Sequence, residues 1–105
     1  MTLEEVKALP VFQTRTIAKA AEDPDTMAYI LNCLAKLYAG DYGEVPAEDT
    51  DANNRELRDG AGRILARYKP AGKLESDIYI IANFYAEDPD NPEANYTYIL
   101  YCNEY

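Results

Sequence analysis

The acidic side chains between residues 39 and 54 are the first candidates for chemistry in this chain of 105 residues. The stretch AGDYGEVPAEDTDANN holds five carboxylates and no basic residue. General acid–base catalysis needs only two placed carboxyl groups, so one hypothesis is a carboxylate-dependent enzyme or metal-binding protein centred on Asp41, Glu44 and Asp49. Nothing in their spacing marks a catalytic pair, and acidic residues ahead of a helix also stabilise its partially positive N-terminus. We therefore expect helix capping and no enzymatic activity.

A calcium site is the sharpest of the metal-binding hypotheses. Residues 49–53 match the first half of an EF-hand loop. The sixth position of that loop requires glycine and the twelfth a bidentate glutamate, whereas Asn54 and Gly60 stand there. Without the sharp turn and the last two oxygens the loop cannot close round the ion. We expect neither a metal nor another cofactor.

Other catalytic arrangements lack their residues. Histidine is absent, which removes Ser-His and Cys-His nucleophiles and most zinc sites. Residues 40–43, GDYG, have neither the spacing nor the lysine of a phosphate-binding loop. Cys33 and Cys102 both lie among apolar residues, which is typical of small buried hydrophobes.

The net charge of −9 restricts the class of partner. It repels phosphate backbones and anionic lipids, so we expect no direct nucleic-acid or membrane binding and favour a basic protein partner. The alternative is that the charge serves solubility alone. No apolar run could span a bilayer and the N-terminus has no signal-peptide pattern, so we expect a cytoplasmic protein with one domain over residues 1–105.

Helix signals dominate the first half of the chain. Thr2 and Glu5 form a capping-box pattern for a short helix that Pro10 ends, and residues 11–14 have the composition of a short strand. A brief helix capped by Thr14 or Thr16 should follow. The clearest helix begins at Asp25 or Thr26, and Gly40 stands at its C-terminal end. Its apolar stripe, which we expect in the core, comprises Met27, Ile30, Leu31, Leu34, Leu37 and Tyr38.

A second long helix is predicted from about Glu48 to Tyr68. Its apolar stripe comprises Leu57, Ala61, Ile64, Leu65 and Tyr68. The opposite face carries charged residues every four positions: Asp51, Arg55, Asp59, Arg63 and Arg67. Gly60 and Gly62 each cost about 1 kcal/mol inside a helix, which close packing over them would offset.

The C-terminal third predicts a β-hairpin. Residues 77–85 and 95–102 are rich in aromatic and β-branched side chains and flank the turn-rich AEDPDNPEA. The fold class is therefore α+β: two long helices packed on a small antiparallel sheet with a C-terminal β-hairpin, with residues 11–14 as a candidate further strand. Both hairpin strands are apolar on both faces, so helices should cover one face and tyrosines much of the other.

Tyrosine is heavily used, with ten residues. Six lie in or beside the hairpin: Tyr79, Tyr85, Tyr96, Tyr98, Tyr101 and Tyr105. Such side chains are favoured at protein interfaces, and they also pack cores with their hydroxyls at the rim. Platforms that stack single-stranded bases come with basic residues, which the hairpin lacks. The hairpin could also serve as a structural homo-oligomerisation module.

Acidic residues concentrate in three loops, at 22–25, 41–51 and 87–93. Carboxylate-rich loops with interleaved tyrosines could imitate a phosphate backbone and occupy the nucleic-acid channel of a basic protein. The candidate partner-binding residues are Asp41, Tyr42, Glu44, Glu87, Asp88, Asp90, Tyr96 and Tyr98.

From about Thr14 to its end, the chain resembles a family of small, mostly uncharacterised proteins carried by plasmids, phages and other bacterial mobile elements. The residues that carry the resemblance are Gly40-Asp41-Tyr42-Gly43, Asp49, Asn53, Gly60, Arg63-Ile64-Leu65, Tyr68, Ile80-Ile81, Thr97, Ile99-Leu100 and Glu104-Tyr105. The family commonly has tryptophan in place of Tyr42, and a short turn in place of the acidic segment 86–94.

The resemblance implies a genomic setting and transfers no activity to particular residues. Small acidic proteins from that setting are often inhibitors of host defence, and some look like anti-CRISPR proteins, which block a guide-directed nuclease. The resemblance therefore implies an inhibitor that binds a basic nucleic-acid-handling defence protein, such as a guide-loaded nuclease.

Overall fold

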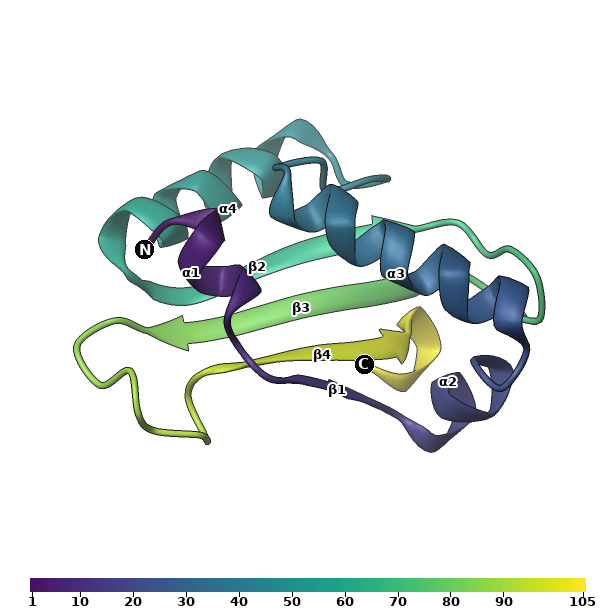
Figure 1. Ribbon diagram of the computed structural model, residues 1–105. Helices are drawn as coiled ribbons and strands as arrows, with labels where there is room; N and C mark the ends of the chain where they lie inside the picture. Colours follow the sequence, from purple (N-terminus) through teal and green to yellow (C-terminus); the bar gives the residue numbers. More distant parts are fainter.

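A computed structural model describes all residues from Met1 to Tyr105 as an α+β domain (Figure 1). The elements in chain order are α1 (Leu3–Lys7), β1 (Val11–Gln13), α2 (Arg15–Ala20), α3 (Pro24–Tyr38), α4 (Ala47–Asp59), β2 (Ala61–Tyr68), β3 (Ile78–Tyr85), β4 (Tyr96–Tyr101) and the 3-10 helix η1 (Cys102–Glu104).

The four strands form one sheet in the order β1-β4-β3-β2. β2–β3 and β3–β4 are antiparallel, so the predicted C-terminal hairpin is matched in part: its two strands pair, but they lie in the interior of the sheet between β2 and β1. β1 pairs with β4 in parallel, so the prediction of a purely antiparallel sheet is wrong. No short turn joins these two strands, and a long connection through the rest of the chain permits the parallel direction.

The capping patterns of the two short helices are confirmed. Thr2 Oγ1 accepts the N–H of Glu5 at 3.2 Å, while the Glu5 carboxylate accepts the N–H of Thr2 at 3.1 Å. Thr14 Oγ1 accepts the N–H of Ile17 at 3.3 Å and thereby begins α2. Hydroxyl and carboxylate oxygens satisfy helix donors that would otherwise lack partners.

α3 begins slightly earlier than predicted, because Asp23 provides its N-cap and Pro24 its first residue. Its core-facing residues include Ile30 and Leu37, as expected. Met27 and Leu31, in contrast, are 37% and 56% exposed, so the prediction that the whole stripe lies in the core is wrong. They face the short edge strand β1, which does not extend far enough to cover them.

The predicted helix from Glu48 to Tyr68 is two elements. α4 ends at Asp59, and Gly60 adopts a left-handed conformation (φ +75°) with its N–H donating to Glu56 O at 2.9 Å. The chain then continues as β2. Glycine reaches positive φ without steric cost, so Gly60 ends the helix, and the prediction that it is packed inside one is wrong.

The core lies between the helices and one face of the sheet (Figure 1). Strand residues alternate between the two faces. The core-facing set in β2, β3 and β4 is Ile64, Ala66, Tyr68, Ile78, Ile80, Ala82, Phe84, Thr97, Ile99 and Tyr101. The other face carries most of the hairpin tyrosines, as predicted. Cys33 is buried, whereas Cys102 is only partly buried, and both are free thiols.

The outer edge of β2 is paired with side chains and loop backbone. Asn53 from α4 is 3% exposed and forms two hydrogen bonds of 2.9 Å with Leu65, one to its carbonyl and one from its N–H. The amide group thus pairs with β2 as a neighbouring strand would, and it fixes α4 against the sheet.

Every helix of the fold is too short or too polar to cross a membrane.

One buried hydroxyl offers a test of the core. Thr97 Oγ1 is fully buried and has no hydrogen-bond partner. We expect Thr97→Val to increase the free energy of unfolding by about 1 kcal/mol in urea titrations, because it removes an unsatisfied polar group and nearly preserves the shape.

Thr26→Val is the matched control. Thr26 is equally buried, but its hydroxyl donates to Asp23 at 2.8 Å and accepts the N–H of Lys73 at 2.8 Å. This variant should lose about 1–3 kcal/mol. A loss of similar size in Thr97→Val would show that its hydroxyl has a partner in solution.

Candidate functional site

The corner between α3 and α4 contains the GDYG motif, and its residues attach the chain to β2. Asp41 Oδ1 accepts the N–H of Gly43 at 3.0 Å, which tightens the turn. Arg67 N–H then donates to Tyr42 O at 3.0 Å, and Glu44 N–H donates to Arg67 O at 2.7 Å. The corner therefore continues the pairing of the β2 edge that Asn53 begins.

Gly43 is required at this corner for two reasons. Its φ is +71°, a conformation that other residues adopt only with strain. A Cβ there would also collide with the carbonyl oxygen of Arg67 and approach the ring of Tyr68 to 2.7 Å. The motif thus has a structural role in which backbone meets backbone.

The prediction that Tyr42 lies on a contact surface is wrong. Its side chain is 5% exposed and belongs to the core, and this burial raises the pKa of its hydroxyl. Asp41 and Glu44 are exposed on either side of the buried Tyr42, because the positive φ of Gly43 breaks the alternation that would otherwise place Glu44 on the same side as Tyr42. Of the three predicted contact residues in this corner, only Asp41 and Glu44 are exposed.

The carboxylate hypothesis receives little geometric support. A shallow pocket of about 260 Å³ includes Asp41 and Glu44 but is lined by Lys36 and Lys69 as well, and Asp49 does not line it. Asp49 instead lies in the first turn of α4, where its charge stabilises the helix N-terminus. No group of three or more Cys, Asp or Glu side chains is arranged to hold a metal ion.

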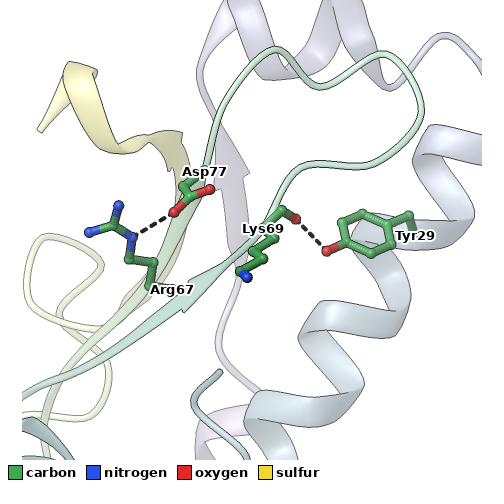
Figure 2. Close-up of polar contacts among 4 residues, drawn as sticks. All are labelled: Tyr29, Arg67, Lys69 and Asp77. Atoms are coloured by element: carbon green, nitrogen blue, oxygen red, sulfur yellow. Dashed lines mark hydrogen bonds and ion pairs between the residues drawn. The ribbon is translucent and has the colours of Figure 1, made fainter. Parts of the chain in front are cut away.

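The loop between β2 and β3 is attached at both ends (Figure 2). Arg67 Nε and Asp77 Oδ2 form an ion pair at 2.9 Å, and Tyr29 OH of α3 donates to the carbonyl oxygen of Lys69. Burial raises the pKa of Tyr29 to about 12, so this donor stays protonated at neutral pH. The Tyr29 contact holds α3 against the loop, the ion pair joins the two ends of the loop, and neither has an evident chemical role.

The sheet face opposite the core carries an aromatic layer. Tyr79 and Tyr105 meet edge to face at 5.6 Å between ring centroids, and the Arg63 guanidinium lies 5.2 Å from the Tyr105 ring. Beneath the rings, Ile81 and Leu100 are 5% and 8% exposed. Because β2 is a strand, it places Arg63 and Arg67 on this face, where no basic residue was expected.

Phe12, Tyr96 and Tyr98 form the exposed end of this layer. Tyr96 lies 6.3 Å from Phe12 and 6.4 Å from Tyr98 between ring centroids, both in edge-to-face arrangements. Phe12 is 54% exposed and Tyr98 36%. With Gln13 and Pro92 they line a shallow pocket of about 440 Å³. Pro92 belongs to the acidic β3–β4 loop, so the loop and the rings are neighbours.

A buried asparagine organises that acidic loop. The Asn95 side chain is 3% exposed; it donates to Asp88 O at 2.8 Å and to Asn91 O at 3.0 Å, and it accepts the N–H of Tyr85 at 2.9 Å. The acidic side chains Glu87, Asp88 and Asp90 all remain exposed. Tyr85 donates to Glu87 at 3.1 Å, and this hydrogen bond and the carboxylate charge raise the pKa of Tyr85.

The structure divides the predicted partner-binding residues into two groups. Tyr96 and Tyr98 lie beside the loop that carries Glu87, Asp88 and Asp90. Asp41 and Glu44 lie elsewhere, because Gly43 pairs with Arg67 whereas the loop follows Tyr85, which pairs with Ala61. Ala61 and Arg67 are six positions apart along β2, which is about 20 Å at roughly 3.3 Å per residue.

Sequence reasoning missed Phe12 as a site residue. Its apolar side chain indicates a strand, but the sequence does not show that β1 lies at the sheet edge, which is what leaves the Phe12 ring exposed. The exposed aromatic neighbours of Phe12 come from β4, far away in the sequence, and no spacing rule joins them.

Comparison of the chain with protein-family models, with curated proteins and with solved structures finds no match. The resemblance to proteins of mobile elements therefore stays a prediction.

The two glycines of the GDYG motif, Gly40 and Gly43, provide a test of its structural role. Gly40 also has positive φ (+85°), but its nearest neighbour, Leu3 Cδ1, would lie at 3.7 Å from an added Cβ, an ordinary contact. We expect Gly40→Ala to cost about 1–2 kcal/mol of stability from backbone strain alone. Gly43→Ala should cost about 3 kcal/mol or more, since the collision adds to the strain.

Thermal and urea unfolding of both variants measure this difference. Equal stability losses would mean that the corner does not pair with β2 as described.

Proposed function

We propose that the protein is a non-enzymatic binding protein that inhibits a basic nucleic-acid-handling protein, such as the guide-loaded nuclease of a bacterial defence system. The class of partner comes from the net charge of −9 and from the resemblance to proteins of mobile elements. The contact site comes from the geometry of the sheet and the β3–β4 loop.

One observation carries the proposal: exposed aromatic rings lie beside an exposed acidic loop. We call this the aromatic–acidic surface; it comprises Phe12, Tyr96, Tyr98, Glu87, Asp88 and Asp90. Large rings that bury area at low entropic cost anchor interfaces, and charges at the rim accelerate association with a partner of opposite sign. The surface offers both properties in one place.

The second acidic group, Asp41 and Glu44, is a weaker candidate. It lies about 20 Å away along β2. Its neighbours in the pocket are Lys36 and Lys69, which reduce the local negative charge. The proposal therefore depends on the β3–β4 loop rather than on a continuous imitation of a phosphate backbone by both groups.

Homo-oligomerisation through the aromatic face is the second candidate. The observation in its favour is that the face opposite the core leaves Tyr98 and Tyr105 36% and 66% exposed. The net charge of −9 on each copy opposes it. Light scattering at several concentrations distinguishes the two candidates, because a dimer forms without any partner.

Charge variants with equal net charge test the proposal. The loop variant combines Glu87→Gln, Asp88→Asn and Asp90→Asn; the control combines Glu22→Gln, Glu48→Gln and Asp51→Asn, all exposed residues outside the loop and outside the candidate binding residues. We expect purified protein to bind a guide-loaded nuclease at about 50 mM salt and more weakly at about 500 mM. The loop variant should weaken binding at least tenfold and the control less than threefold.

Tyr98→Ala should also weaken binding about tenfold, because it removes an anchoring ring. The measurement is a titration by interferometry or calorimetry, with cleavage inhibition as a second readout. If the protein neither binds nor inhibits such nucleases at low salt, the proposal fails.

A further inference from the structure

The two edges of the sheet are treated differently by the fold. At β2, Asn53 pairs with Leu65, and the corner 42–44 pairs with Arg67. At the other edge, β1 uses alternate residues to bond β4: Thr97 N–H donates to Pro10 O at 2.8 Å and Thr14 N–H to Ile99 O at 3.1 Å.

The intervening residues of β1 therefore direct their backbone groups outward. In a ladder, each residue whose N–H and C=O serve the neighbour alternates with one whose groups point away. Val11 and Gln13 are the residues that point away, and their N–H and C=O groups have no partner on the free side of β1. Natural proteins usually cover such an edge or place charges in it, whereas no further strand covers β1 and none of its three residues is charged.

An apolar groove runs along the core side of this edge. It has a volume of about 290 Å³ between β1 and α3, and none of its lining residues is charged. Val11, Met27 and Leu31 are 43%, 37% and 56% exposed within it. A strand laid beside β1 would place every second side chain in this groove.

The remaining side chains of such a strand, those between the ones in the groove, would lie on the side of the sheet opposite the core. There the exposed ring of Phe12 and its neighbour Tyr98 provide a second apolar surface. Five of the seven large hydrophobic side chains that are exposed in this protein gather at this edge: Val11, Phe12, Met27, Leu31 and Tyr98. Both faces of an added strand would therefore be apolar.

Charge distinguishes the two ends of the edge. Val11 pairs with Thr97, which follows the β3–β4 loop closely, and Pro92 of that loop lies beside Phe12. The N-terminal end of β1 thus borders the β3–β4 loop, which carries Glu87, Asp88, Asp90 and Glu93. The opposite end leads into α2, whose first residue is Arg15. A segment that fits this edge is apolar in the middle and basic at the end that meets the loop.

We propose that β1 accepts an extended segment of the basic partner as an added antiparallel strand. Uncharged β-branched residues lie along Val11–Gln13, and lysine or arginine residues at the segment's C-terminal end meet the acidic loop. Strand addition supplies affinity through main-chain hydrogen bonds and specificity through alternate side chains, and antiparallel pairs are the commoner kind. This inference rests on the proposed function, because it specifies how the partner is held.

A synthetic peptide tests the edge directly. The probe is the acetylated and amidated peptide Thr-Val-Ile-Val-Thr-Lys-Lys-Lys, titrated into isotope-labelled protein and followed by NMR. We expect saturable shifts of the Val11 and Gln13 amides with a Kd of about 1 mM or tighter. The same peptide with N-methyl groups on alternate residues should lose at least tenfold in affinity, because it cannot donate along the edge.

Two variants at one position separate the backbone from the side chain. Gln13→Pro removes the outward N–H and keeps the bonds to β4, and proline is tolerated on edge strands. It should weaken peptide binding at least tenfold, whereas Gln13→Ala, which keeps the N–H, should change it less than twofold. Thermal unfolding confirms that both variants are folded, and the N-methylated peptide repeats the test without altering the protein.

The outcomes divide clearly. Absence of saturable shifts up to about 5 mM peptide, or equal binding of the N-methylated peptide, overturns strand addition. A dimer of the free protein through β1 also overturns it, since the edge would already be occupied. If the peptide binds but no guide-loaded nuclease does, the proposed function fails and strand addition stands. If a nuclease binds wild type and Gln13→Pro equally, strand addition fails and the proposed function stands.

Discussion

The need to pair the outer edge of β2 is the constraint on which the rest of the structure depends. A β-strand at the border of a sheet exposes backbone donors and acceptors, and here Asn53 pairs with those of Leu65 and the corner 42–44 with those of Arg67. Those bonds fix α4 through Asn53 and the α3–α4 connection through Tyr42 and Glu44. The helices therefore take their places over the core face partly because the strand beside them needs partners, and the opposite edge and the opposite face are left free for other contacts.

The residues on which the family resemblance rests have structural roles in this arrangement. Gly43 allows the close approach to Arg67, Asn53 pairs with Leu65, and Gly60 ends α4 with a positive φ. A resemblance built on such residues predicts a shared architecture more directly than a shared partner. The exposed residues that we propose for binding lie mainly outside those motifs, in β1 and in the loop where the chain departs from the family pattern.

The sequence predicted the short helices and the hairpin because their signals are local: caps, turns and β-branched runs. The prediction of a single helix over residues 48–68 is wrong for a physical reason. Arg63 and Arg67, like Ile64 and Tyr68, are four residues apart, and that spacing places a pair on one face of a helix and equally on one face of a strand. Only Gly60, which is typical of a helix C-terminus, distinguishes a helix followed by a strand from one long helix. Likewise, no local signal reveals that Tyr42 points inward or that Phe12 lies exposed, because both depend on strands that are distant in the sequence.

The parallel pairing of β1 with β4 has a consequence for folding. Strands β2, β3 and β4 form a meander of neighbouring contacts, whereas Thr14 and Glu104, which bond at this edge, are separated by 90 residues. Contacts between residues so distant in the sequence carry a large loop-closure cost, and the strand that offsets it along this edge has three residues. The β1 segment should therefore form late, and its amides should exchange with solvent through openings that leave the meander intact. Occupation of that edge would raise the free energy of this local opening and so couple recognition to the last step of folding.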